Sequence, residues 1–221
     1  MGKASRLKRE RNAAKVYRFI KEESHANALV NGNVWINTLE KCRAYEDPLQ
    51  GDEEEAVHRY NSGYIMGGSD DPSLMVVAAR CSINIGPGCP NITLNNNTSV
   101  HRIPDAFVLC ATEFFNPKEL NQTFGMYCVE ISNPNKFFQL LTMKLRELHQ
   151  IRQAAWGKVI YRKRNYSGLE DPPGPLGFVK PADPYSVQRE VRFLWTINSA
   201  RDLLPFLLEV PEVTSLCRRI A

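Results

Sequence analysis

The sequence predicts an α+β fold in a single domain at residues 16–221, preceded by a basic and flexible arm at residues 1–15. Hydrophobic residues make up 43% of the 221-residue chain, which is enough to bury a core. Short apolar runs with strand character alternate along the chain with stretches of helical spacing. The sequence contains no internal repeat, and its Pro-rich stretch at 171–175 is too short to link two domains.

Seven segments have the composition and alternation of β-strands. The first, 16–20, places Tyr17 and Phe19 on one side and Arg18 on the other. Three are apolar enough to be buried on both faces, namely 74–80, 106–112 and 124–131. The remaining strands are expected at 34–39, 157–162 and 187–195.

Two segments have the pattern of helices. Residues 22–30 end at Asn31-Gly32, a suitable left-handed terminus. The stronger pattern begins at Asn133-Pro134, which supplies a capping residue and a proline for the first helical position. Its apolar stripe, expected to face the core, consists of Phe137, Leu140, Leu141, Leu145, Leu148 and Ile151. Loops are expected at 40–73, with one short helix, and at 86–99, and residues from 201 onward are expected to add one or two short helices.

The net charge of +4 is concentrated at the start of the chain. The segment from Lys3 to Lys15 is dense in Lys and Arg and holds a single acidic residue, Glu10. Such an arm can follow the phosphate backbone of RNA or DNA. It can equally be a solvated leader that only aids solubility, so both interpretations stay open.

Several classes of protein are not supported by the sequence. It has neither an apolar run long enough to cross a bilayer nor a secretory signal, so a cytoplasmic protein without membrane partners is expected. The six cysteines are scattered and are expected to be buried reduced thiols rather than metal ligands. The four histidines lack neighbouring ligands at metal spacing and are interpreted as solvated side chains, so no metal is expected.

Gln188 and Glu190 form the motif with the clearest chemistry. Strand alternation over 187–195 places both side chains and Arg192 on one face. A carboxylate stabilises the cation-like sugar that forms when a glycosidic bond breaks, and the Gln188 amide could orient the incoming nucleophile. The alternative is a surface charge pair of Glu190 with Arg189 or Arg192 at a sheet edge.

In the order of these residues the sequence resembles the ADP-ribosyltransferase superfamily. Its members place an Arg or His on the first strand, a Ser-Thr-Ser-like element on the second, and Gln/Glu-x-Glu near the end. Here Arg18 lies on the first expected strand, Asn37 and Thr38 on the second, and Gln188 and Glu190 near the end. The similarity is closer to a family of bacterial proteins that share this layout over residues 16–197, including the Asp-Pro segment at 45–48.

The resemblance implies a split β-sheet core with flanking helices and NAD as co-substrate. It implies that Glu190 and Gln188 are catalytic, that Arg18, Tyr17, Asn37 and Thr38 bind NAD, and that Tyr185 meets the target. The implied activity releases nicotinamide and transfers ADP-ribose to nucleic acid (RNA or DNA) or to protein, as in bacterial toxins and phage-defence effectors, some of which a neutralising antitoxin holds. A non-catalytic module on the same fold stays open. It would bind nucleic acid through the arm and exposed Trp156 and Tyr161, or an antitoxin through 40–73.

Overall fold

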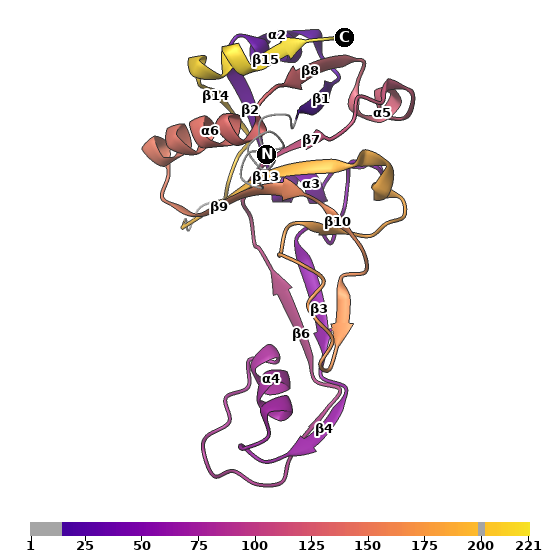
Figure 1. Cartoon of the computed structure of the whole chain (residues 1–221), viewed down its shortest axis with the longest axis vertical. Coiled ribbons are helices and arrows are strands. Elements are labelled where there is room, and N and C mark those ends of the chain that lie inside the picture. Colours follow the sequence, from indigo (N-terminus) through magenta and orange to yellow (C-terminus); the bar gives the residue numbers. More distant parts are fainter. Residues whose placement is uncertain (1–14, 199–201) are drawn as a thin grey trace, which may run out of the picture. The chain divides into compact units, whose positions relative to one another are not determined.

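The computed structural model describes residues 15–198 and 202–221, and it confirms the mixed α+β class. The basic arm lies outside the described residues except for Lys15. The predicted domain consists of two compact units, and the chain passes back and forth between them (Figure 1). Unit 1 comprises residues up to Glu55, Pro104–Val159 and residues from Pro184 on, and unit 2 comprises Ala56–Ile103 and Ile160–Asp183.

Unit 1 is built on an eight-stranded antiparallel sheet that divides at β7. Its strands are β1 (Val16–Ile20), β2 (Asn33–Thr38), β7 (Phe107–Thr112), β8 (Tyr127–Ile131), β9 (Ile151–Lys158), β13 (Glu190–Ile197), β14 (Phe206–Glu209) and β15 (Cys217–Arg219). One edge of β7 pairs with β13 along its whole length, and β13 pairs in turn with β9. The other edge is shared between β2, at Phe107 and Val108, and β1, at Thr112.

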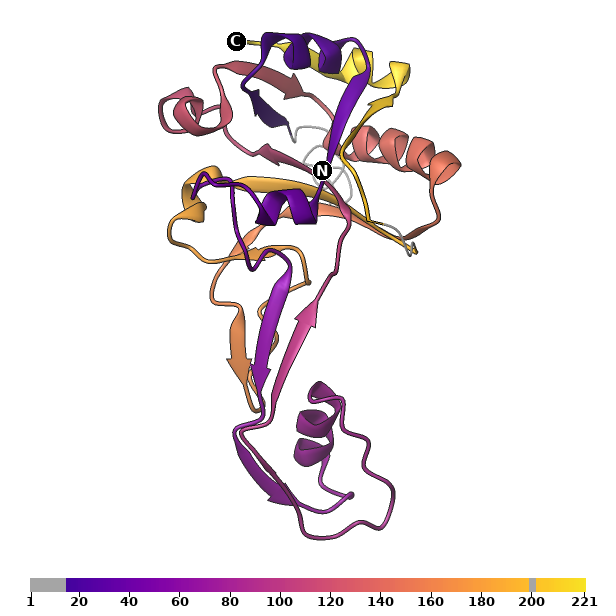
Figure 2. The ribbon, with the colours of Figure 1, turned by 180° about the vertical axis from the view of Figure 1, so that it is seen from behind.

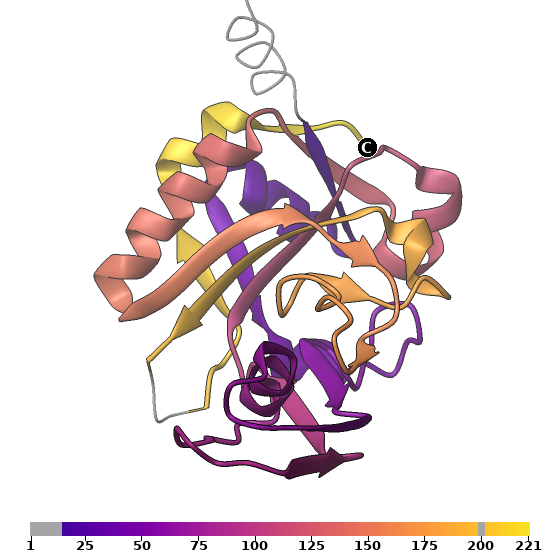
Figure 3. The ribbon, with the colours of Figure 1, turned by 60° about the horizontal axis from the view of Figure 1, so that its bottom comes forward.

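In the described residues of unit 1, four helices and two 3-10 turns accompany the sheet. They are α2 (Glu23–Val30), α3 (Leu39–Arg43), α5 (Pro117–Phe124), α6 (Pro134–Leu148), η1 (Tyr185–Gln188) and η2 (Pro211–Leu216). Figure 3 shows α6 lying along β9. The predicted start of α6 is confirmed, because the Asn133 side chain accepts a hydrogen bond from the backbone nitrogen of Lys136.

The core of unit 1 lies between α6, α2 and the sheet. Phe137, Leu141 and Leu145 of the predicted stripe are fully buried there, whereas Leu148 is exposed. Phe137 packs edge-on against Phe193 of β13, with ring centroids 5.8 Å apart. The Trp195 indole nitrogen donates to Thr142 Oγ1 at 2.7 Å, so this large buried side chain is also satisfied as a donor.

Unit 2 combines small sheets with one helix. Its strands are β3 (Val57–Asn61), β4 (Tyr64–Gly67), β5 (Ile92–Asn95), β6 (Thr98–Arg102), β10 (Ile160–Tyr161), β11 (Asn165–Ser167) and β12 (Val179–Lys180), and its helix is α4 (Pro72–Arg80). Figure 2 shows β11, β3 and β6 side by side. A second small core forms where Leu74, Val77 and Ala78 of α4 meet Tyr60 and Leu94.

Several sequence predictions about the elements are wrong. Residues 74–80 form helix α4 rather than a strand, because the Asp71 side chain accepts hydrogen bonds from the backbone nitrogens of Ser73 and Leu74 and Pro72 occupies the first turn. The expected loops 40–73 and 86–99 contain strands β3, β4, β5 and part of β6, and helix α5 was not predicted. The end of the chain adds β14, η2 and β15 in place of helices alone.

Candidate functional site

The site is built on the face of the unit 1 sheet that β2, β7 and β13 share. Asn37 of β2 is the cross-strand partner of Val108 on β7. Glu190 of β13 is the partner of Thr112, two strand repeats further along β7. Cross-strand partners, and residues two apart on one strand, project to the same face. Asn37 and Glu190, which sequence order alone suggested, therefore lie on one face.

Glu190 belongs to a buried cluster of three charged side chains. Arg192 Nε donates to Glu190 Oε1 at 2.7 Å. Its Nη1 and Nη2 donate to Glu55 Oε1 and Oε2 at 2.7 and 3.0 Å, so one guanidinium binds two carboxylates. Glu55, Glu190 and Arg192 are 1%, 4% and 1% exposed. The alternative of a surface charge pair at a sheet edge is therefore wrong, since β13 has partners on both sides.

The two carboxylates determine the electrostatics of this cluster. Burial disfavours the charged form of Arg192, but the neighbouring Glu190 and Glu55 outweigh it, so the pKa of Arg192 is held well above its usual value. Arg192 is thus a fixed positive charge. It orients the Glu190 carboxylate through one hydrogen bond and forms a bidentate ion pair with Glu55.

Gln188 lies beside this cluster but not on the strand. The expectation of a strand from 187 is wrong, because Tyr185–Gln188 forms a 3-10 turn and Arg189 takes a left-handed conformation (φ 44°) before β13 begins at Glu190. The Gln188 side chain is nevertheless buried. Its amide nitrogen donates to the backbone oxygen of Leu49. Tyr185 is also buried, and its hydroxyl donates to the backbone oxygen of Gly51 at 2.7 Å.

These contacts attach the loop of residues 45–55 to the site. Within the loop, Asp47 Oδ1 accepts from the backbone nitrogen of Leu49 at 2.9 Å, so the Asp-Pro segment forms a tight turn. The far end is held by Arg43, whose Nε and Nη2 donate to the backbone oxygen of Glu55 at 3.0 and 2.8 Å. Arg43 Nη1 also donates to the backbone oxygen of Pro104 at 2.6 Å.

Arg18 contributes a second, separate guanidinium. Its Nη2 donates to the backbone oxygen of Trp35 at 3.3 Å. Its Nη1 is buried and has no hydrogen-bond acceptor among the described residues. Burial lowers the pKa of Arg18, and interactions with Cys110, Tyr45 and Cys42 oppose that shift. Arg18 also lines a cavity of about 60 Å³ together with Ile20, His25, Leu29, Val34 and Trp35.

The other predicted NAD-binding residues have defined contacts. Asn37 Nδ2 donates to the Tyr45 hydroxyl at 3.1 Å, and burial raises the pKa of that hydroxyl. Thr38 is buried and caps α3, because its Oγ1 accepts from the backbone nitrogen of Lys41. Tyr17 is the cross-strand partner of Thr112, and its ring packs against Phe115.

Some residues of the site were missed by sequence reasoning. Glu55 is the main one, and only its membership in the acidic run 52–55 was visible. Tyr45 and Cys110 were likewise not considered, although Cys110 is the cross-strand partner of Arg192 and interacts electrostatically with Arg18. Trp156 was expected to be exposed, but it is half-buried and stacks on Phe193 with ring planes 15° apart.

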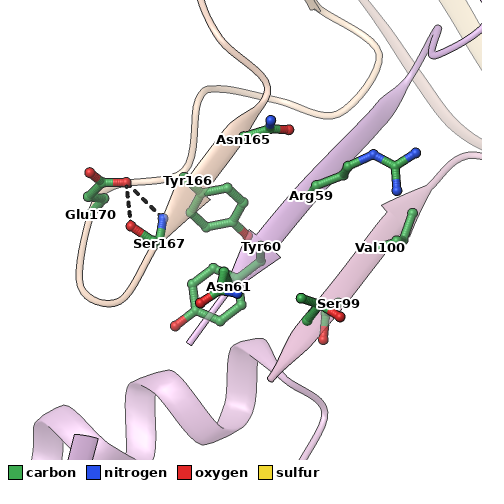
Figure 4. Close-up of a pocket in the computed structure, with 10 residues that line it drawn as sticks. Arg59, Tyr60, Asn61, Ser99, Val100, Asn165, Tyr166, Ser167 and Glu170 are labelled. Atoms are coloured by element: carbon green, nitrogen blue, oxygen red, sulfur yellow. Dashed lines mark hydrogen bonds between the residues drawn. The ribbon is translucent and has the colours of Figure 1, made fainter. Parts of the chain in front are cut away.

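Unit 2 carries a separate pocket of about 430 Å³ on strands β3, β6 and β11 (Figure 4). The rings of Tyr60 and Tyr166, which both line this pocket, lie 4.9 Å apart. Arg80 faces both rings and donates to the backbone oxygens of Gly168 and Glu170 at 2.7 and 2.8 Å. The pocket also has polar lining residues, among them Ser167 and Glu170. Glu170 accepts hydrogen bonds from the backbone nitrogen and hydroxyl of Ser167.

The thiols and histidines differ in part from expectation. All six cysteines are free; Cys128 is buried, whereas Cys89 is exposed. His58 is buried rather than solvated. In residues 15–198 and 202–221, His, Cys, Asp and Glu side chains form no group of three that could hold a metal ion. None of the helices in these ranges is long and apolar enough to span a membrane.

Comparison of the chain with models of known protein families, with curated proteins and with solved structures finds no match.

Proposed function

We propose that this protein is an NAD-dependent ADP-ribosyltransferase that acts in the cytoplasm as a bacterial toxin or phage-defence effector. The observation that carries the proposal is the location of Glu190. It lies on the same sheet face as Asn37, its carboxylate is oriented by Arg192, and the sheet divides at the neighbouring strand β7. Arg18, Asn37 and Glu190 also follow one another in the order that the resemblance implies.

In the proposed reaction the bond between C1′ of the nicotinamide ribose and the ring nitrogen breaks. Nicotinamide leaves with the bonding electron pair, and the Glu190 carboxylate stabilises the cation-like ribose in a site that excludes water. An acceptor nucleophile then attacks C1′ and loses its proton. The Arg18 guanidinium supplies a fork that suits the NAD pyrophosphate, and its Nη1 has a donor position to offer, since no acceptor within the described part of the chain takes it.

The remaining predicted residues have proposed roles around this centre. Tyr17 and Asn37 contact NAD, and Thr38 holds Asn37 through the hydrogen bond from its backbone nitrogen to Asn37 Oδ1 at 3.0 Å. Because Glu190 is only 4% exposed, substrate entry requires the 45–55 loop to open. Tyr185 and Gln188 hold the closed loop, and in the open state Gln188 orients the nucleophile while Tyr185 meets the target.

The decisive experiment replaces Glu190 by Gln and measures nicotinamide release from NAD. Gln keeps an acceptor oxygen for Arg192 but removes the negative charge, so release falls by about 100-fold or more. Glu130→Gln is the matched control, because Glu130 is also a buried carboxylate of this sheet, paired with Lys15 and Arg218. Equal release by the Glu190→Gln variant and the unmodified protein would contradict the proposal. Thermal unfolding of both variants checks that each is folded.

A non-catalytic module on this fold, binding nucleic acid or held by an antitoxin, is the second candidate. The observation that favours it is the pairing within the buried cluster, in which Arg192 binds both carboxylates. In that case calorimetry detects no NAD binding by the full chain, and Glu190→Gln changes only stability. NAD binding that weakens in an Arg18→Ala variant would exclude this candidate.

A further inference from the structure

Three aromatic side chains form a platform beside the candidate site. Tyr17 and Phe19 alternate along β1 and project to the same side. The ring of Phe115, in the loop that follows β7, lies 5.9 Å from each of them and is nearly parallel to Phe19, at 9°. Phe115 is 44% exposed although it stacks on Phe19 and packs at a tilt of 47° against Tyr17, so an apolar aromatic surface remains accessible. We name Tyr17, Phe19 and Phe115 the aromatic platform.

Strand register places the platform next to Glu190. Tyr17 on β1 pairs with Thr112 on β7, and Thr112 pairs with Glu190 on β13. The three residues form one row across adjacent strands on the same face. At one strand spacing per step, the Tyr17 and Glu190 backbones lie about 10 Å apart. Tyr17, the platform residue in this row, is thus two strands away from Glu190.

The positive charge that precedes the platform in the sequence favours a nucleic acid as its partner. Strand β1 begins at Val16, directly after the basic segment from Lys3 to Lys15. The platform is therefore joined covalently to the most positively charged stretch of the sequence. Aromatic rings that stack bases, combined with Lys and Arg that track phosphates, are the two components of single-strand recognition.

We infer that the aromatic platform binds a base of single-stranded nucleic acid and that this strand is the ADP-ribose acceptor. The inference rests on the proposed function and names its substrate class. A nucleophilic nitrogen or oxygen of a nucleotide next to the stacked base attacks C1′ of the NAD ribose; nicotinamide departs with the electron pair of the broken bond, and the nucleophile's proton passes to solvent. Duplex nucleic acid is a poorer partner, because its base faces are already covered.

Binding is tested first, without NAD, by fluorescence anisotropy of the full chain with a labelled mixed-sequence single-stranded oligonucleotide and with its duplex. Phe115→Leu keeps an apolar contact with Tyr17 and Phe19 but removes the flat ring, and it weakens single-strand binding by about tenfold. Phe115→Ala weakens it at least as much. Tyr64→Ala is the matched control, since Tyr64 is an aromatic of unit 2 that is 69% exposed. Unchanged affinity of both Phe115 variants, or equal affinity for the duplex, overturns the inference.

Transfer is tested next with NAD labelled on its adenylate phosphate, offered with the single strand and, separately, with cell protein. Label on the single strand, reduced in Phe115→Leu, supports the inference. Label on protein alone overturns it while leaving the proposed function intact. Absence of nicotinamide release with every acceptor instead refutes the proposed function and, with it, the acceptor role, whereas the anisotropy result still decides whether the platform binds a single strand.

Discussion

Arg192 is the residue on which the candidate site depends most directly. Its guanidinium joins Glu190 to Glu55, which lies 137 residues before Arg192 in the sequence, and all three side chains are removed from water. Both carboxylates accept hydrogen bonds from this one guanidinium. A buried cluster of this kind contributes more to the geometry of the site than to net stability, since desolvation offsets much of the attraction.

Replacing Arg192 by Lys tests this dependence. Lysine is a point charge that cannot bind two carboxylates through a planar fork, so at least one of Glu55 and Glu190 loses its hydrogen bond to residue 192. Loss of one partner of a buried ion pair costs about 3–5 kcal/mol, which chemical denaturation measures readily. Arg218→Lys is the control, because Arg218 pairs with Glu130 from an exposed position, and its change is expected to stay below about 1 kcal/mol. Similar stabilities for the two variants would refute the role assigned to Arg192.

At this scale the sequence predicted the spacing of Glu190 and Arg192 on one face but not their partner. Alternation along a strand is a local property, and it was enough to place these two residues together. The contact of Glu55 with Arg192 depends on how the 45–55 loop folds back over β13. No residue near Glu55 in sequence carries that information, and its acidic neighbours made it resemble a solvated charge run.

Among the elements, the 45–55 loop is the one that connects the site to the rest of unit 1. Gly51 lies where the loop folds back on itself, so that a Cβ atom there would collide with the backbone oxygen of Tyr45. Its own backbone oxygen accepts the hydrogen bond from Tyr185. The loop can therefore keep its hold on Tyr185 only with glycine at this position.

Gly51→Ala is expected to loosen the loop without unfolding the sheet. Backbone amides of residues 45–55 exchange their hydrogens faster in the variant, while those of β7 and β13 keep their protection. Hydrogen exchange followed by mass spectrometry measures both. Gly86→Ala serves as the control, since a Cβ atom at Gly86 meets no heavy atom within 4 Å. Unchanged exchange in the loop would show that the collision is relieved by a shift elsewhere.

In unit 2, β3 and β6 bring two histidines into register. His58 pairs with His101, and the Nε2 atoms of both are buried with no hydrogen-bond partner among the described residues. Burial, the nearby Arg164 and His101 together lower the pKa of His58 below the ordinary histidine value. The folded state therefore holds His58 neutral at a pH where the unfolded chain takes up a proton.

This difference in pKa makes unit 2 less stable in acid. Stability is fully present above the unfolded value of about 6.5 and falls as the pH drops below it, because the unfolded chain then binds more protons. Hydrogen exchange of β3 and β6 amides, corrected for the intrinsic rate, reports the local stability at several pH values. His58→Gln removes this titration, so its stability is expected to change less between about pH 8 and pH 5. An identical pH dependence in the variant would exclude His58 as the cause.

Strands were predicted more accurately from the sequence where they are buried. The segments at 16–20 and 106–112 were predicted well, because apolar residues and alternation are strong local signals there. The strands of unit 2 are short and polar, and they pair with segments distant in sequence, as β3 does with β11. The apolar run at 74–80 is compatible with a helix or a strand. The signal for a helix is the preceding Asp71-Pro72, which supplies the capping residue and a proline in the first turn.

For the molecule as a whole, the uneven distribution of charge predicts how binding responds to salt. Deleting residues 1–15 removes six basic residues and one acidic residue, a charge of +5, and so changes the net charge of the chain from +4 to −1. Affinity for single-stranded nucleic acid then falls. The slope of the logarithm of the binding constant against the logarithm of the salt concentration becomes shallower by about 0.7 for each phosphate that the arm no longer neutralises. Anisotropy titrations at several salt concentrations measure this slope. An unchanged slope would indicate that the arm is only a solvated leader.

The hydrogen bonds of Arg43 have a consequence for how this chain could have arisen. The same guanidinium binds the carbonyl of Glu55, where the chain leaves unit 1, and that of Pro104, where it returns. A segment whose two ends meet at one side chain can be inserted, exchanged or removed with little effect on the strands around it. Residues 56–103 meet this condition within unit 1, but β3 pairs with β11 at Asn165–Ser167 in unit 2. A recombinant protein that exchanges this segment to acquire a new target, with Glu190 and Arg192 kept in place, therefore has to exchange residues 160–183 with it.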